Sequence, residues 1–309
     1  MTVKLLILSG QEPWINNFYN LNLLPVRLHM VDKMRASLVQ GEVELATLNE
    51  FISLQGHQYV AFWLLNQATD FWKAGQFGVT LSALTYIEKW KFEEYLSIND
   101  KNRAAMLWTS LVTSQASLLP EEQLFRLDKA LALNPNFPDA IALKGITLAN
   151  LGDRQSGKAL LMQALSIVTE KETDINPNGQ YYIKSGVNKK AGEEGWIWMR
   201  LGQYYLNVEG DFAEAENALK KSLLLYPENE WANDFMVTLF VRQELYSDAL
   251  PYAQKAVSLN RNIPEFWRKL GDIYWFLGEK EEAVKIYEQL IQSDPSFSSL
   301  LADRIEKFR

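Results

Sequence analysis

The sequence contains no cysteine and only two histidines, His29 and His57, among its 309 residues. Without cysteine, a disulfide framework, a thiolate metal site and a cysteine nucleophile are all excluded. Two histidines are too few for a metal centre built from several histidine ligands. We therefore expect this chain to hold neither a metal ion nor a cofactor.

An excess of basic residues is also missing. The chain has 31 Lys and Arg against 38 Asp and Glu, which gives a formal net charge of −7. A general nucleic-acid binder needs a basic surface to displace counterions from phosphates, so we expect no nucleic-acid partner. Hydrophobic residues make up 48% of the chain, which is typical of a globular protein and not of a disordered one.

Long hydrophobic runs are absent as well. The longest apolar run near the start is Leu5 to Leu8, whereas a secretory signal needs about seven or more apolar residues and a small-residue cleavage site. No window approaches the roughly eighteen apolar residues of a membrane-spanning helix. The sequence therefore predicts no membrane insertion by this chain and, by default, a cytoplasmic location.

A repeating pattern organises most of the chain, and it is clearest in residues 264–297. The expected first helix carries Trp267, Leu270, Gly271 and Tyr274, and Gly278 lies at the following turn. The expected second helix carries Ala283, Tyr287 and Leu290, and Pro295 ends it. This order resembles the tetratricopeptide repeat, a helix-turn-helix motif of about 34 residues. The resemblance implies two antiparallel helices that approach closely at the small residues Gly271 and Ala283.

Further copies precede this one. Residues 230–263 place Val237 where the first helix normally has a small residue, and residues 195–229 carry one extra residue near Gly210. Weaker copies cover residues 138–171 and 104–137, and residues 61–97 form a degenerate one. Between the copies the chain alternates helix and turn, with no extended period-two pattern of a strand.

The resemblance implies an all-α, right-handed superhelical solenoid. We expect residues 1–60 to form a helical cap or degenerate repeat, residues 61–171 to form tetratricopeptide-like repeats, and residues 195–297 to form three good repeats. Residues 171–194 are expected to be an inserted loop, since they are rich in Gly, Asn and Lys and lack a helical period. Residues 298–309 are expected to be a helix that caps the last apolar face.

One motif suggests nucleotide chemistry. Gly152, Gly157 and Lys158 fit the spacing of a phosphate-binding loop, but Ala159 replaces its magnesium-binding Ser or Thr. The motif also requires a preceding buried strand, and here a repeat helix precedes it. We interpret Gly152 as a repeat turn. No other catalytic constellation emerges, because adjacent glutamates such as Glu281 and Glu282 point apart on a helix. The chain is therefore predicted not to be an enzyme.

Ten tryptophans are the most informative feature. Trp198 and Trp267 fill framework positions, whereas other large side chains fall where the repeat family lines a concave groove. The predicted groove residues are Trp108, Trp196, Met199, Gln203, Trp231, Asp234, Arg242, Arg268, Asp272, Trp275 and Phe276. Exposed aromatics anchor interfaces, so these residues favour a groove for a peptide. The alternative interpretation is that the inserted loop covers them and they belong to the core.

The predicted function is a non-enzymatic scaffold or adaptor that holds a protein or peptide partner in this groove. The Lys and Asn residues with which chaperone-binding relatives clamp a terminal carboxylate are missing here, so a chaperone-tail adaptor is disfavoured. Two alternatives stay open. The chain could be the soluble repeat domain of a larger bacterial membrane-associated protein, such as a glycosyltransferase or surface-polymer ligase, or an enzyme that uses the inserted loop.

Overall fold

The computed structural model describes residues 24–115, 117–170 and 189–308. The chain divides into two compact units, Met1–Pro135 and Asn136–Arg309, and we describe each by itself. This division falls between α8 and α9, at the joint between the predicted repeat copies 104–137 and 138–171. In a solenoid each repeat contacts only its neighbours, so compact units can separate at any joint between repeats.

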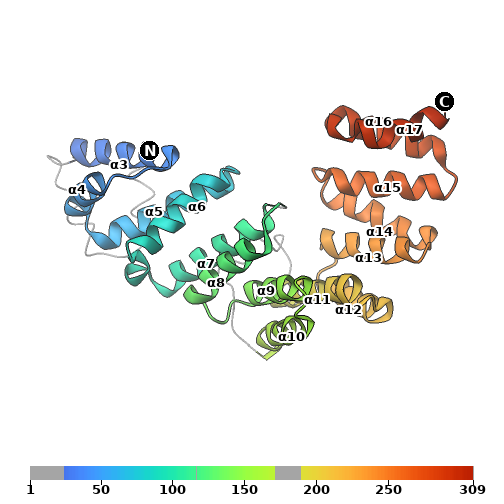
Figure 1. Cartoon of the computed structure of the whole chain (residues 1–309), viewed down its shortest axis with the longest axis horizontal. Coiled ribbons are helices and arrows are strands. Elements are labelled where there is room, and N and C mark those ends of the chain that lie inside the picture. Colours follow the sequence, from blue (N-terminus) through green and yellow to red (C-terminus); the bar gives the residue numbers. More distant parts are fainter. Residues whose placement is uncertain (1–23, 116, 171–188, 309) are drawn as a thin grey trace. The chain divides into compact units, whose positions relative to one another are not determined.

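Unit 1 is built from helical pairs, coloured blue to green in Figure 1. Its helices are α3 (Leu24–Gln40), α4 (Leu45–Gln55), α5 (His57–Lys73), α6 (Phe77–Lys89), the 3-10 turn η2 (Phe92–Tyr95), α7 (Ile98–Thr113) and α8 (Pro120–Leu133). The pairs α3 with α4, α5 with α6 and α7 with α8 each pack together. Pairing survives in the degenerate residues 61–97, because Gly75 takes the left-handed turn conformation that the repeat requires.

Unit 2 is a stack of four helical hairpins and a final helix. Its helices are α9 (Pro138–Asn150), α10 (Arg154–Glu170), α11 (Lys189–Tyr204), η4 (Tyr205–Glu209), α12 (Phe212–Leu225), α13 (Glu230–Arg242), α14 (Tyr246–Leu259), α15 (Pro264–Phe276), α16 (Lys280–Ser293), η5 (Pro295–Phe297) and α17 (Ser298–Phe308). Figure 1 shows α13 to α16 lying in successive layers. The described residues of both units contain no strand, so the fold is all-α.

Small residues set the spacing within the hairpins. A Cβ atom added to Gly271 would lie 2.5 Å from the Tyr287 ring, and one added to Gly202 would lie 2.6 Å from Leu219. These close approaches confirm that Gly271 is a packing contact, although its partner is the Tyr287 ring and not Ala283. Proline at the start of α9 and α15 favours helix initiation, since its missing N–H is not needed there.

Three predicted segments fall partly outside the described residues. Of the expected cap or degenerate repeat at residues 1–60, residues 1–23 lie outside them, and the remainder contains α3, α4 and the start of α5. The inserted loop was expected to extend to residue 194, but α11 already begins at Lys189, and residues 171–188 lie outside the described residues. Residues 189–194 therefore belong to the first helix of the next hairpin. Within this helix Gly192 and Gly195 are buried and Ala191 is partly buried. At the other end, α17 buries Leu301 and Ile305 against Tyr287 and Leu290 of α16, as a capping helix does.

The extra residue of the copy at 195–229 becomes a π-helix. Residues Tyr205–Glu209 form five residues of wider helix, and Gly210 follows in the left-handed conformation. An insertion inside a helix is accommodated in this way because one turn expands while the hydrogen-bond ladder continues on either side. The repeat framework therefore stays in register through α12.

Candidate partner-binding face

The first helices of the unit 2 hairpins, α9, α11, α13 and α15, form one layer. Along this layer α11 contacts both α9 and α13, and α13 contacts α15, whereas the second helices pack between consecutive first helices on one side. We call the opposite side of the layer the first-helix face. Its members are Asp139, Trp196, Arg200, Gln203, Trp231, Asp234, Thr238, Arg242, Glu265, Arg268, Lys269, Asp272 and Phe276.

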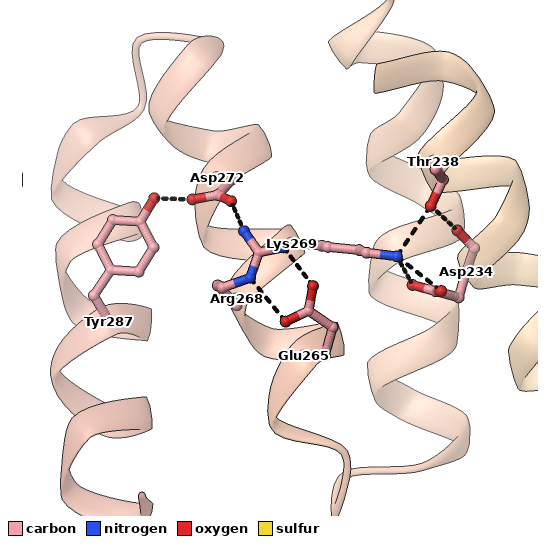
Figure 2. Close-up of polar contacts among 7 residues, drawn as sticks. All are labelled: Asp234, Thr238, Glu265, Arg268, Lys269, Asp272 and Tyr287. Carbon is pink, nitrogen blue, oxygen red and sulfur yellow. Dashed lines mark hydrogen bonds and ion pairs between the residues drawn. The ribbon is translucent and has the colours of Figure 1, made fainter. Parts of the chain in front are cut away.

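Lys269 joins α15 to α13 on this face. Its Nζ atom lies 2.7 Å from Oδ1 and 2.8 Å from Oδ2 of Asp234, and 3.0 Å from the Thr238 hydroxyl. Figure 2 shows the lysine extended across the gap between the two helices. Burial raises the pKa of the Asp234 carboxyl, and the charge and hydrogen bonds of Lys269 oppose that rise only in part. The contact is an ion pair that largely desolvates its carboxylate.

Arg268 organises a second group on α15. Its Nε atom donates to Glu265 across 2.8 Å, and its terminal nitrogens reach Glu265 and Asp272. The Tyr287 hydroxyl of α16 donates to Asp272 across 2.8 Å, which extends the group to the second helix. Burial alone would raise the pKa of Glu265, but the hydrogen bonds and charge of Arg268 lower it overall. Glu265 is therefore held ionised by its neighbour.

A second buried carboxylate, Asp139 on α9, faces α11. Its Oδ1 atom accepts a hydrogen bond of 2.9 Å from the Trp196 indole, and Arg200 Nε lies 4.0 Å away. No described residue donates a hydrogen bond to Oδ2. Burial raises the pKa of Asp139, while the charge of Arg200 and the bond from Trp196 act in the opposite direction. The guanidinium of Arg200 lies 5.2 Å from the Trp196 ring centroid, so the three side chains form one cluster.

Arg242 stabilises the π-helix from the next repeat. It donates to the Leu206 carbonyl across 2.7 Å and to the Asn207 side-chain oxygen across 2.8 Å. Both acceptors lie within Tyr205–Glu209, the segment that holds the extra residue. Arg242 therefore ties the expanded turn to α13.

Comparisons with known proteins agree with this architecture. Tetratricopeptide repeat models match residues 197–229 and 236–296. Tetratricopeptide repeat protein 17 of Danio rerio is 27% identical over 108 residues, which are 34% of this chain and 9% of that protein. The general transcriptional corepressor trfA of Dictyostelium discoideum is 32% identical over 103 residues, which are 32% of this chain and 7% of that protein. The chain thus spans less than a tenth of the length of these two relatives.

Solved structures share the fold at low identity. The type IV pilus biogenesis factor PilW is 15% identical with a TM-score of 0.51, over 81% of this chain and 98% of that chain. PilF of Pseudomonas aeruginosa is 16% identical with a TM-score of 0.50, over 82% of this chain and 98% of that chain.

The chain contains tetratricopeptide repeats. Its matched repeats are those of α11 to α16, and they carry most of the first-helix face. Tetratricopeptide repeats are protein-interaction scaffolds, and this chain shares that general architecture.

The structure corrects the predicted groove at two residues. Trp108 lies in the core of unit 1, only 3% exposed and edge-on to Phe125, and Met199 is 1% exposed in the cluster between α11 and α13. Both were assigned to the groove by register alone. A large apolar side chain at a groove position is buried wherever the neighbouring helices leave space for it, because burial removes its apolar surface from water.

Most polar groove candidates are engaged within the protein. Asp234 is buried under Lys269, Arg268 and Asp272 bind each other, and Gln203 accepts a hydrogen bond from Arg200. Arg200, Glu265 and Lys269 belong to the same face and were missing from the predicted set. The sequence could have indicated Arg200 and Lys269, because both cations occupy the same repeat position. Arg200 follows Met199, and Lys269 follows Arg268.

The aromatic candidates divide into covered and open residues. Trp275 packs against the cluster of α16 and α17, with Lys280 5.3 Å from its ring, because the capping helix covers this end of the array. Trp196 is half-buried beside Asp139. Trp231 and Phe276 are 38% and 53% exposed. Phe276 stacks on Tyr246 at 4.6 Å between ring centroids, which fixes its position.

The phosphate-loop motif is a repeat turn. Gly152 has a φ of 103° between α9 and α10, and Asp153 accepts the Ser156 N–H at the start of α10. A Cβ atom added to Gly157 would lie 2.6 Å from the Gly145 carbonyl, so Gly157 is the small packing residue of its hairpin. Lys158 pairs with Glu209 across 2.9 Å. Gly152, Gly157 and Lys158 each have a structural role, and the Asp153 carboxylate already accepts an N–H group of the first turn of α10.

The described residues offer little chemistry beyond packing and ion pairing. Within residues 24–115, 117–170 and 189–308, no group of three or more His, Asp or Glu is arranged to hold a metal ion. The helices of the same ranges include none with the length and apolarity needed to cross a bilayer. His57 is the first residue of α5 and stacks on Tyr95.

Proposed function

We propose that this chain is a non-enzymatic scaffold that holds a protein or peptide partner on the first-helix face of α11, α13 and α15. The observation that carries the proposal is the exposure of Trp231 and Phe276 on that face. Neither is needed to fill the core, which the framework residues of α13 to α16 complete. Exposed aromatics held in fixed positions are typical anchors of an interface.

The remainder of the face supports this function. Its ion pairs join neighbouring first helices, so the surface beneath a partner is rigid before binding. A rigid surface loses little conformational entropy when it binds, which favours affinity. Its paired side chains offer no activated nucleophile or general base, which is why we propose binding and not catalysis.

The alternative of a repeat domain within a larger membrane-associated protein stays a prediction. The comparisons show only that segments similar to this chain occur within longer proteins, since they make up less than a tenth of each of the two relatives named above. A search for hydrophobic segments in the complete reading frame would decide it.

Site-specific photocrosslinking in the native host tests the proposal. We expect a photoreactive phenylalanine analogue in place of Trp231 to form a discrete adduct with a partner. The control places the same analogue at Leu224, which is 82% exposed on the second helix α12. Equal adducts at both positions, or an adduct at position 224 alone, would contradict binding on the first-helix face.

A further inference from the structure

We propose that the first-helix face takes an extended peptide segment without net charge, which places two large apolar side chains on Trp231 and Phe276. This inference rests on the proposed function and specifies its ligand. It follows from where the two open aromatics lie and from what fills the surface between them.

The two aromatics lie on one stripe of the face. The repeat places Glu265 on α15 at the position that Trp231 has on α13, and Phe276 follows Glu265 by eleven residues. Eleven residues make just over three helical turns at about 3.6 residues per turn, so both positions point to the same side, about 16 Å apart along the axis. The neighbouring helix adds a lateral step of about 9 Å. The anchors are therefore about 19 Å apart.

The surface between the anchors is charged but internally paired. Lys269 is bound by Asp234, and Arg268 is bound by both Glu265 and Asp272. A charged ligand side chain would have to displace one of these partners. The new ion pair would then contribute little to affinity, because the cost of desolvating the ligand charge offsets the attraction. The face therefore complements a ligand segment that brings no charge of its own to this region.

The polar floor also favours an extended ligand over a helix. Glu265 is half-exposed, and its carboxylate has capacity for further hydrogen bonds beyond those from Arg268. An extended backbone presents unpaired N–H groups to such an acceptor, whereas a helix has already satisfied most of its own. At about 3.3 Å per residue, an extended chain spans 19 Å in about six residues. The expected ligand has two large apolar residues at about that spacing.

The test is selection from a phage-displayed library of random peptides on the full chain. Enriched peptides are synthesised, and their affinities are measured by fluorescence anisotropy in low and high sodium chloride. We expect two apolar residues about six positions apart and no charged residue between them. We expect affinity to change by less than about twofold with salt, because no ion pair forms across the interface.

Three variants locate the binding. Trp231→Ala and Phe276→Ala should each weaken an enriched peptide by about tenfold or more, as truncation of an anchor does. Leu224→Ala removes an even more exposed apolar side chain, from α12, and should leave affinity unchanged. Circular dichroism and thermal melting of each variant confirm that the repeats remain folded.

The outcomes separate this inference from the proposed function. Peptides that depend on Trp231 and Phe276 but carry charges, and lose tenfold affinity in high salt, overturn the neutral ligand alone. Peptides that depend on both aromatics but are helical in the complex, by circular dichroism, overturn the extended ligand alone. Failure to enrich any peptide, or affinity indifferent to both substitutions, counts against the proposed function itself. Sedimentation of the wild type as a dimer that Trp231→Ala dissociates would assign the face to a second copy of this chain and overturn both.

Discussion

Two joints between first helices in unit 2 each bury an aspartate, but they treat it differently. At the joint between α13 and α15, both oxygens of Asp234 lie within 2.8 Å of Lys269. At the joint between α9 and α11, Asp139 accepts from Trp196, and Arg200 lies 4.0 Å away. Burial raises the pKa of both carboxyls. The difference teaches that cations at the same repeat position, Lys269 and Arg200, can either form a tight ion pair or lie farther from a carboxylate that is satisfied mainly by a neutral donor.

The joint between α11 and α13 uses a third solution. Here Phe235 packs on the cluster that contains Met199, and Arg242 binds the π-helix at the edge. Apolar contact replaces the buried ion pair. The three joints therefore differ in how much of their stability depends on a single charged side chain. Four predictions test that difference.

The largest effect is expected at the tight ion pair. Lys269→Met should destabilise unit 2 by about 2–3 kcal/mol, below the full cost of breaking a buried pair because both groups are partly exposed and Asp234 is free to take up a proton. Hydrogen exchange should rise most in α13 and α15. Lys285→Met is the control, since Lys285 forms an exposed pair with Glu282, and it should leave the stability unchanged.

The edge of the apolar joint should be next. Arg242→Met removes two hydrogen bonds to the π-helix and should cost about 1–2 kcal/mol, as bonds from a charged donor do. Exchange should increase in residues 205–210, while α15 and α16 keep their protection. An unchanged exchange rate in the π-helix would show that Arg242 does not stabilise it.

Arg200→Met should have a smaller effect than Lys269→Met. The longer separation from Asp139 weakens the attraction, so we expect a loss of about 1 kcal/mol, measured by urea denaturation beside Lys269→Met. A loss equal to that of Lys269→Met would abolish the distinction between the two joints.

The smallest effect concerns pH. Because folding raises the pKa of Asp139, its stabilising contribution is full below the ordinary aspartate value and is lost as pH rises through the folded value. Asp139→Asn keeps an acceptor for Trp196 and cannot ionise, so it should gain stability relative to wild type as pH rises from 4 to 7. Asp234→Asn should be less stable than wild type, since it leaves Lys269 without its ion pair, but its stability relative to wild type should change with pH in the same direction, because folding also raises the pKa of Asp234. Urea midpoints of the three proteins at both pH values check the contrast.

Much of the fold could be predicted from residue types. Gly271, Gly278 and Pro295 mark a helix contact, a turn and a stop, because each depends on local backbone geometry that few other residues allow. The candidate face was predicted less well. Lys269 and Arg200 escaped notice because a cation on a helix is usually a solvated residue, and only its neighbour across the joint shows otherwise.

The sequence by itself determined the helical hairpins, their order from α9 to α16, and the repeat turn at Gly152, since these follow from spacing and from local conformational limits. Only the tertiary structure decided which side chains of the first helices face outward. Trp108 and Trp231 both occupy predicted groove positions, yet one is 3% exposed and the other 38%. Burial of a side chain depends on the residues that pack against it from other helices, and the periodic pattern of one helix does not specify those residues.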